Sequence, residues 1–209
     1  MNYPSSVILE NLETPRLILR HHQKEDFDQY IDAEQSSAKK LSPWFGWINQ
    51  DRGYNTAEDV KQYFLYLDEL NSSDKPRQLH FFIFEKTTNK YIGSVIFFRV
   101  DWDIPYFYFS YWLDSRKSGN GYMTEAVNAL TRLCFDVYGA KRVQISASIK
   151  NPNSLNIPKR LNFTLEGRLK NYAMHLSEKE VTDAIMYACY SPNELPELEC
   201  SWKLREVVR

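Results

Sequence analysis

The sequence has no excess of basic residues: 26 Lys and Arg stand against 27 Asp and Glu, giving a formal net charge of −1. Proteins that neutralise nucleic-acid phosphates need a clustered surplus of positive charge, so we do not expect nucleic acid as a partner. Long apolar runs are missing too. None approaches the roughly 20 residues that cross a bilayer, and no secretory signal opens the chain, so we expect no membrane contact and a cytoplasmic location.

Cysteine is scarce. The three cysteines, at positions 134, 189 and 200, are odd in number and lack the spacing of a metal site. This pattern predicts reduced thiols and no bound metal. A chain of 209 residues is long enough for one well-buried core. We therefore expect one domain over residues 10–190, followed by a tail at 191–209.

Aromatic residues, in contrast, are abundant, with 14 Tyr, 12 Phe and 5 Trp. Such side chains suit strands and ligand grooves. Residues 38–55 contain Trp44, Phe45 and Trp47 without clean periodicity. This stretch predicts a long aromatic loop, and long ordered loops are often functional.

Hydrophobic periodicity predicts an α/β domain. The predicted strands cover residues 16–20, 80–86, 91–100, 106–113, 143–149, 163–172 and 180–190. The predicted helices cover about 25–33, a segment that begins at Thr56 and reaches Leu70, 123–137 and 152–161. Residues 80–113 form an antiparallel meander in this prediction.

The segment from Leu113 to Ala126 joins a predicted strand to the best-patterned helix. Gly119 and Gly121 remove side chains where successive backbone N–H groups would approach a ligand, and the helix start adds unpaired N–H groups. This arrangement is an anion cradle suited to a pyrophosphate, although the glycines alone would also fit an ordinary turn. The Gly-Lys-Ser/Thr ending of a nucleoside-triphosphate loop is missing, and the preceding meander does not make a dinucleotide fold.

Three motifs resemble those of the GNAT acetyltransferases. Residues 116–121, Arg-Lys-Ser-Gly-Asn-Gly, match the Arg/Gln-x-x-Gly-x-Gly/Ala signature, and Thr124-Glu125-Ala126 follows as in many members. Asn151-Pro152-Asn153-Ser154 resembles the second conserved block of the family. Thr14 to Arg20 resembles the opening strand of the RimJ/RimL-like branch, which acetylates N-terminal amines of ribosomal proteins. The likeness spans about residues 10–190 in the correct order.

The resemblance implies a fold and a cofactor. The fold is a mixed, mostly antiparallel sheet of six to seven strands flanked by about four helices, with two central strands that splay after Leu113. The implied activity is that of an acetyl-CoA-dependent N-acetyltransferase. The implied acetyl-CoA-binding residues are Trp112, Leu113, Arg116, Lys117, Ser118, Gly119, Asn120, Gly121, Tyr122, Met123, Asn151 and Ser154. Arg116 and Lys117 would add charge-assisted contacts to the phosphates.

The resemblance also implies catalytic roles. Ser154 would lie beside the thioester sulfur and donate a proton, while Asn151 would orient the cofactor; both residues also suit helix capping, and the two readings are compatible. Many relatives carry a Glu where this chain has Tyr108, so no carboxylate base can be assigned by resemblance. The candidates are His175, which titrates near neutrality, or a water held by tyrosines such as Tyr108.

The predicted acceptor groove combines Trp44, Phe45 and Trp47 with Trp102 and Tyr106, because aromatic faces attract a cationic amine. Each ring taken singly would also serve to cover the core edge. The expected acceptor is the N-terminal α-amine of a ribosomal or other protein or peptide. A small-molecule amine, such as a polyamine or an aminoglycoside, and a non-catalytic acyl-CoA sensor are the alternatives. A homodimer is one of the oligomeric states compatible with the sequence.

Overall fold

The computed structural model describes residues 7–48, 51, 53–73 and 75–206, and within them the chain forms one nine-stranded sheet and four α-helices. The strands are β1 Val7–Glu13, β2 Leu17–Arg20, β3 Leu79–Glu85, β4 Lys90–Asp101, β5 Tyr106–Leu113, β6 Arg142–Ser148, β7 Thr164–His175, β8 Glu180–Cys189 and β9 Ser201–Glu206. The helices are α1 Phe27–Leu41, α2 Ala57–Asn71, α3 Tyr122–Asp136 and α4 Pro152–Arg160. No helix in the described ranges is long and apolar enough to reach across a bilayer.

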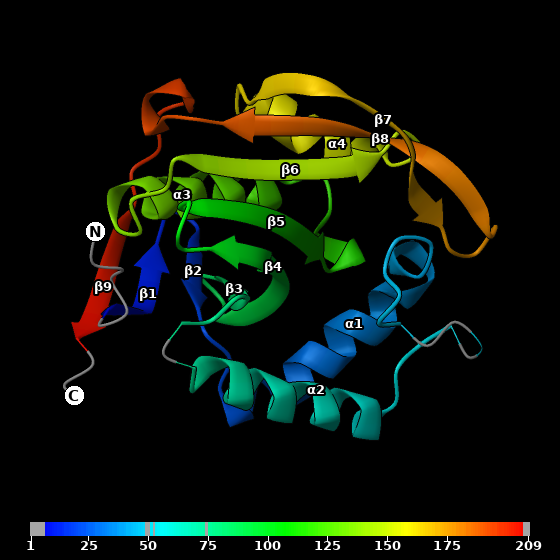
Figure 1. The fold of residues 1–209 in the computed structure, drawn as a ribbon. Coiled ribbons are helices and arrows are strands. Elements are labelled where there is room, and N and C mark those ends of the chain that lie inside the picture. The colour runs from blue at the N-terminus through cyan, green and yellow to red at the C-terminus, as the bar shows by residue number, and fades with distance from the viewer. Residues whose placement is uncertain (1–6, 49–50, 52, 74, 207–209) are drawn as a thin grey trace.

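The strand order is β7-β8-β6-β5-β4-β3-β2-β1-β9. Only β5 and β6 run parallel; every other neighbouring pair is antiparallel. Helices α1 and α2 lie on one face of the sheet, and α3 lies on the other (Figure 1). The buried side chains accordingly form two clusters, one with α3 and α4 and one with α1 and α2. The predicted GNAT-type fold of a mixed sheet with four helices is therefore confirmed.

The sheet has two more strands than the upper limit of the prediction, and both lie at the chain ends. Strand β1 falls in the lead before residue 16, and β9 falls in the tail, for which the sequence predicted no secondary structure. The two strands pair with each other antiparallel at one edge of the sheet. Each of these two strands pairs with a segment almost 200 residues away, and the local hydrophobic pattern contains no information about such a distant partner.

Helix boundaries follow local signals at α2 and α3. The Thr56 hydroxyl accepts the Asp59 N–H, and the Asp59 carboxylate accepts the Thr56 N–H, so a capping box starts α2 as predicted. Gly121 precedes α3 with a left-handed φ of 77°. Helix α1 runs to Leu41, well beyond the predicted end near residue 33, and carries Lys40 in its last turn.

Gly93 on β4 permits a close approach of β4 to the end of β5. Its φ is 154°, and a Cβ at this position would lie 2.4 Å from the Trp112 carbonyl oxygen and 2.9 Å from the Leu113 Cα. Backbone atoms cannot move aside as a flexible side chain can. Only glycine therefore fits beneath the strand end that the sequence assigns to the ligand site.

We expect Gly93→Ala to lower the free energy of unfolding by about 1–3 kcal/mol, because the added methyl group overpacks the β4–β5 contact. Urea unfolding of purified protein measures this loss. Gly167→Ala is the matched control on β7: no atom lies within 4 Å of its would-be Cβ, and a change within about 0.5 kcal/mol is expected. Equal losses for the two variants would contradict the proposed packing constraint.

Candidate functional site

The sheet opens between β5 and β6. Their parallel pairing joins Tyr106–Phe109 to Arg142–Ile145 and ends there. The splay thus begins after Phe109, four residues earlier than the predicted point after Leu113. Residues 110–113 remain paired with β4 only, so their other edge is free of strand partners. Unpaired backbone groups at such an opening are available to a ligand.

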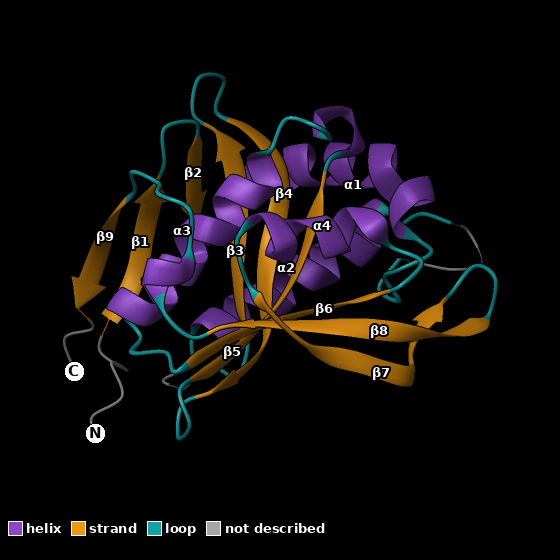
Figure 2. Ribbon diagram, turned by 90° about the horizontal axis from the view of Figure 1, so that it is seen from above, coloured by secondary structure: helices purple, strands orange, loops and turns teal. Residues whose placement is uncertain are grey.

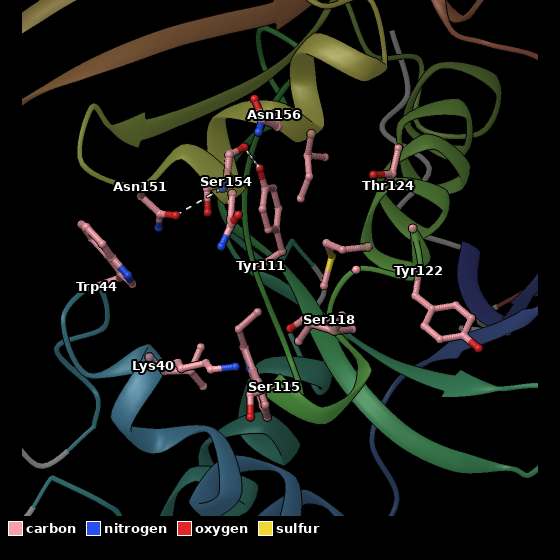
Figure 3. A pocket seen from close by; sticks show the side chains of 18 of the residues that line it. Lys40, Trp44, Tyr111, Ser115, Ser118, Tyr122, Thr124, Asn151, Ser154 and Asn156 are labelled. Carbon is pink, nitrogen blue, oxygen red and sulfur yellow. Dashed lines mark hydrogen bonds between the residues drawn. The ribbon is translucent and has the colours of Figure 1, made fainter.

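A cleft of about 320 Å³ lies at this opening and is called the loop cleft below. It is bounded by the end of β5, the loop into α3, the end of α1, and α4 (Figure 3). Nine of the twelve predicted cofactor-binding residues line it: Trp112, Leu113, Ser118, Gly119, Gly121, Tyr122, Met123, Asn151 and Ser154. Residues nearly 40 positions apart in the sequence are thus brought to one cavity.

Arg116 and Lys117, the predicted side-chain phosphate ligands, are not among the residues that line the loop cleft. The Arg116 guanidinium donates to both oxygens of Asp114 and contacts Asp32 on α1 at 2.6 Å. The Lys117 ammonium lies 3.0 Å from Glu85. Both charges therefore form ion pairs that fix the loop to α1 and β3.

The third predicted residue outside the cleft is Asn120, whose backbone is held by Arg16, just before β2. Arg16 donates to the Asn120 carbonyl oxygen at 2.9 Å, and its Nε donates to Glu125 at 2.6 Å. Thr14 donates to the same carboxylate at 2.6 Å. The C=O and N–H of a trans peptide point in opposite directions, so the Gly121 N–H points away from Arg16. The two family motifs, around residues 14–20 and 116–126, therefore form one unit.

Lys40 and Arg160 supply the positive charge of the loop cleft. Lys40 extends into it from the last turn of α1 (Figure 3), and Arg160 comes from the last turn of α4. Neither makes an ion pair with another described residue, and no acidic side chain among the described residues lines the cleft. Sequence reasoning missed both, because basic residues in last helical turns are common and nothing local ties them to the loop.

Helix α4 is fixed to β5 through an unusual carbonyl. Asn151 caps the helix by accepting the Ser154 N–H at 3.2 Å. Pro158 has no N–H, so the Ser154 carbonyl lacks its normal partner four residues later. The buried Tyr111 hydroxyl donates to that carbonyl at 2.8 Å instead (Figure 3). The proline therefore creates the acceptor that joins α4 to the open end of β5.

A second cavity of about 400 Å³, the inner pocket, adjoins the loop cleft. Both are lined by Trp44, Phe45, Tyr111, Asn151 and Ser154. No Asp, Glu, His, Lys or Arg among the described residues lines the inner pocket. The site where the two cavities meet is therefore polar but uncharged.

Tyr108 lies in the inner pocket, and His175 does not. Tyr108 shares a hydrogen bond with the Ser146 hydroxyl, and burial raises its pKa to about 12. His175 packs edge-to-face on Trp44 with ring centroids 4.8 Å apart, and its Nδ1 accepts the Glu178 N–H at 3.3 Å. The candidate base His175 thus lies at the end of β7, packed on Trp44 and outside the lining of the inner pocket.

The hairpin and the loop after α1 meet above the inner pocket. Figure 2 shows β7 and β8 extending sideways toward that loop, where the Leu176 N–H donates to the Pro43 carbonyl at 2.8 Å. Trp44 and Phe45, which were predicted to contact the acceptor, line the inner pocket. The predicted loop of residues 38–55 is in fact helical as far as Leu41.

Trp102 and Tyr106 lie elsewhere, which corrects their assignment to the same groove. Trp102 follows β4 and packs on Phe107 and Tyr138, with its indole N–H donating to the Pro76 carbonyl. Tyr106 begins β5, at the end remote from the loop cleft. Their aromatic character serves the core and the strand edge at that end.

Comparisons with known proteins agree with this geometry. Residues 16–164 match the family model described as the acetyltransferase (GNAT) domain. The chain is 26% identical over 134 residues to the probable N-acetyltransferase YjcK of Bacillus subtilis (strain 168), covering 64% of this chain and 72% of that relative.

Two solved structures share the fold. RimL, a ribosomal L7/L12 alpha-N-protein acetyltransferase solved with coenzyme A, has a TM-score of 0.74 at 21% identity, covering 85% of this chain and 95% of RimL. Mycobacterium smegmatis RimJ, solved with CoA-disulfide, has a TM-score of 0.74 at 20% identity, covering 95% and 93% of the two chains.

We expect Arg16→Met to weaken coenzyme A binding roughly tenfold, because the Asn120 carbonyl loses the donor that orients the loop. Arg16→Lys should also weaken it, since one ammonium does not reproduce the guanidinium fork. Calorimetric titration gives both affinities. Arg168→Met, which removes an exposed pair with Asp183 on β8, is the control and should leave the affinity unchanged; an unaltered affinity in Arg16→Met would contradict the anchoring role.

We expect Tyr111→Phe to lower the free energy of unfolding by about 1–3 kcal/mol, because the buried Ser154 carbonyl loses its donor. In a Pro158→Ala background the new N–H can bond that carbonyl, so the same substitution should cost less. Urea unfolding of the four proteins forms a double-mutant cycle. A coupling of zero would show that the proline and the tyrosine act independently.

Proposed function

The chain belongs to the GNAT acetyltransferase family and is an acetyl-CoA-dependent N-acetyltransferase, and on that premise we propose that its acceptor is the N-terminal α-amine of a protein or peptide. RimL, which shares the fold, is an alpha-N-protein acetyltransferase, and this supports the proposal. The observation that carries it is the chemistry of the inner pocket, where no described lining residue is a carboxylate or an imidazole.

The acceptor amine must be neutral to act as a nucleophile, and this pocket offers no ordinary base to neutralise it. An α-amine has a pKa of about 7.7–8.0, so roughly a tenth of it is neutral at pH 7. An alkylamine such as a lysine side chain, with a pKa of about 10.4, is neutral in well under one molecule in a thousand. A pocket without a base therefore favours the α-amine, because the lower pKa of that amine leaves more of it neutral.

The residues of the loop cleft fit coenzyme A. The glycine-rich loop and the start of α3 present backbone N–H groups, while Lys40 and Arg160 add positive charge without any opposing acid among the described lining residues. Such a surface suits a ligand with several phosphates. Bound acetyl-CoA supplies the acetyl group as a reactive thioester. The backbone groups along the free edge of residues 110–113 can hydrogen-bond to the amide groups of the pantetheine arm of acetyl-CoA.

Ser154 and Asn151 occupy the boundary between the loop cleft and the inner pocket. We assign the Ser154 hydroxyl the role of proton donor at that boundary, and Asn151 the role of fixing the first turn of α4 through its cap. Tyr108, with a pKa of about 12, stays neutral at physiological pH. It therefore orients the incoming amine or a water by hydrogen bonding rather than acting as an ionised base.

We expect kcat/KM for an N-terminally free peptide to rise about tenfold per pH unit below pH 7.5 and to level off near pH 8, where the α-amine is neutral. With hexylamine the rate should keep rising toward pH 10. Release of free thiol from acetyl-CoA measures both profiles, and mass spectrometry locates the acetyl group. The acetylation of hexylamine in preference to the peptide at pH 7 would overturn the proposal.

His175→Gln is the control for this profile, because His175 lies outside the inner pocket. We expect the same pH dependence in this variant. Binding of acetyl-CoA without turnover on any amine would instead indicate a sensor.

A further inference from the structure

A third cavity of about 470 Å³ lies between α1, α2 and strands β3–β5 and is called the aromatic cavity below. It adjoins the inner pocket, because Phe45, Phe98 and Ser110 line both. Figure 1 shows α1 and α2 side by side against the sheet on this face. An acceptor whose amine occupies the inner pocket can therefore extend into the aromatic cavity.

The walls of the aromatic cavity consist largely of aromatic rings. Tyr30 and Tyr63 come from the two helices, Trp112 from β5, and Trp47 and Tyr66 lie on the exposed rim. Ring faces carry a partial negative charge and attract cations, particularly where water is excluded. The cavity is therefore suited to an organic cation with an apolar stem.

The charged groups of the aromatic cavity also favour a cation. Among the residues that the structure describes, Asp59 is the only lining residue with a formal charge at neutral pH, and no Lys or Arg of that set lines the cavity. His80 also lines it, but burial lowers its pKa to about 3, so its ring is neutral and accepts or donates a hydrogen bond with Tyr63 at 2.8 Å. Nothing in the described lining would repel a cation.

A buried carboxyl group stands behind this wall. Glu34 lies one helical turn after Tyr30 and is 0% exposed, and its carboxyl group is hydrogen-bonded to the backbone of Asn55, which lines the cavity. The Glu34 carboxyl group lies within electrostatic reach of Asp59, and burial raises its pKa to about 7. A cation in the cavity would stabilise the ionised form of this carboxyl group.

Trp112 offers a hydrogen-bond donor on the same wall. Its ring packs against Tyr30 and Trp47, and its indole N–H is buried without an acceptor. A ligand suited to this wall brings a positive charge to the side of Asp59 and Glu34 and a carbonyl-type acceptor for the Trp112 N–H. A peptide with a basic side chain carries both.

We propose that the aromatic cavity binds a lysine or arginine side chain close to the amino terminus of the acceptor peptide. The cationic head lies among the rings near Asp59 and Glu34, and a peptide carbonyl accepts the Trp112 N–H. The proposal rests on the proposed function in that the α-amine of the same peptide lies in the inner pocket. It adds a specificity that the reacting amine alone cannot give.

The kinetic test compares two peptides that differ only at the second residue, lysine in one and norleucine in the other. We expect kcat/KM to be about tenfold higher for the lysine peptide. The ratio should fall toward one in Glu34→Gln, which keeps the shape of the side chain, and in Trp47→Leu at the rim. Glu58→Gln, which removes an exposed charge from the same face of the fold without lining the cavity, should keep the wild-type ratio.

Moving the lysine to the first or third residue in matched peptides identifies the position that reaches the cavity. Equal rates for lysine and norleucine at all three positions, with both peptides acetylated, overturn the inference and leave the proposed function intact. A lysine preference that survives Glu34→Gln and Trp47→Leu also overturns it.

A binding test separates the two proposals. The same peptides with the α-amine already acetylated are titrated into the wild-type protein, with tryptophan fluorescence as the readout. Tighter binding of the lysine peptide than of the norleucine peptide supports the cavity assignment even if no peptide is turned over, whereas equal binding overturns it. Absence of turnover on every free peptide, with acetyl-CoA bound, contradicts only the proposed function.

Discussion

The early end of the β5–β6 pairing is the constraint on which the site depends. Parallel strands that stayed paired beyond Phe109 and Ile145 would satisfy each other's backbone groups and close the sheet. Their separation instead leaves the last residues of β5 bonded on one side only. The separation also places the end of β5 between the glycine-rich loop that leads into α3 and helix α4. Gly93 lets β4 follow β5 to this point without a collision.

Three adjoining cavities meet around this opening, and they differ in charge. The loop cleft is lined by Lys40 and Arg160 and by no described acid, the inner pocket by no described charged side chain, and the aromatic cavity by Asp59 with Glu34 behind it. An anionic donor and a cationic acceptor would thus each reach the uncharged inner pocket from a cavity of complementary charge. The side chains where the loop cleft and the inner pocket meet, such as Ser154 and Asn151, are polar but uncharged.

Much of this fold could be predicted from short-range patterns. Strand β5 has the predicted bounds, and the helix from Tyr122 to Asp136 begins after the predicted glycines. Helix α2 begins at the predicted place, with Thr56 as its cap, and Asn162 before β7 adopts a left-handed φ of 59°. These features depend on neighbours within about four residues, so the sequence alone carries the information. The terminal strands β1 and β9 were missed because they pair mainly with each other, and only Leu12 and Glu13 of β1 pair with the nearby β2.

For the site, the sequence by itself determined the loop of residues 116–122 and the start of α4, since both are fixed by glycine, asparagine and serine at short spacing. Only the tertiary structure decided where the charges of the site lie. It turned Arg116 toward Asp32 and Asp114, and brought Lys40 from a distant helix into the cleft. The partner of a long charged side chain depends on which elements lie next to it in space. That arrangement arises from contacts between residues far apart in the chain.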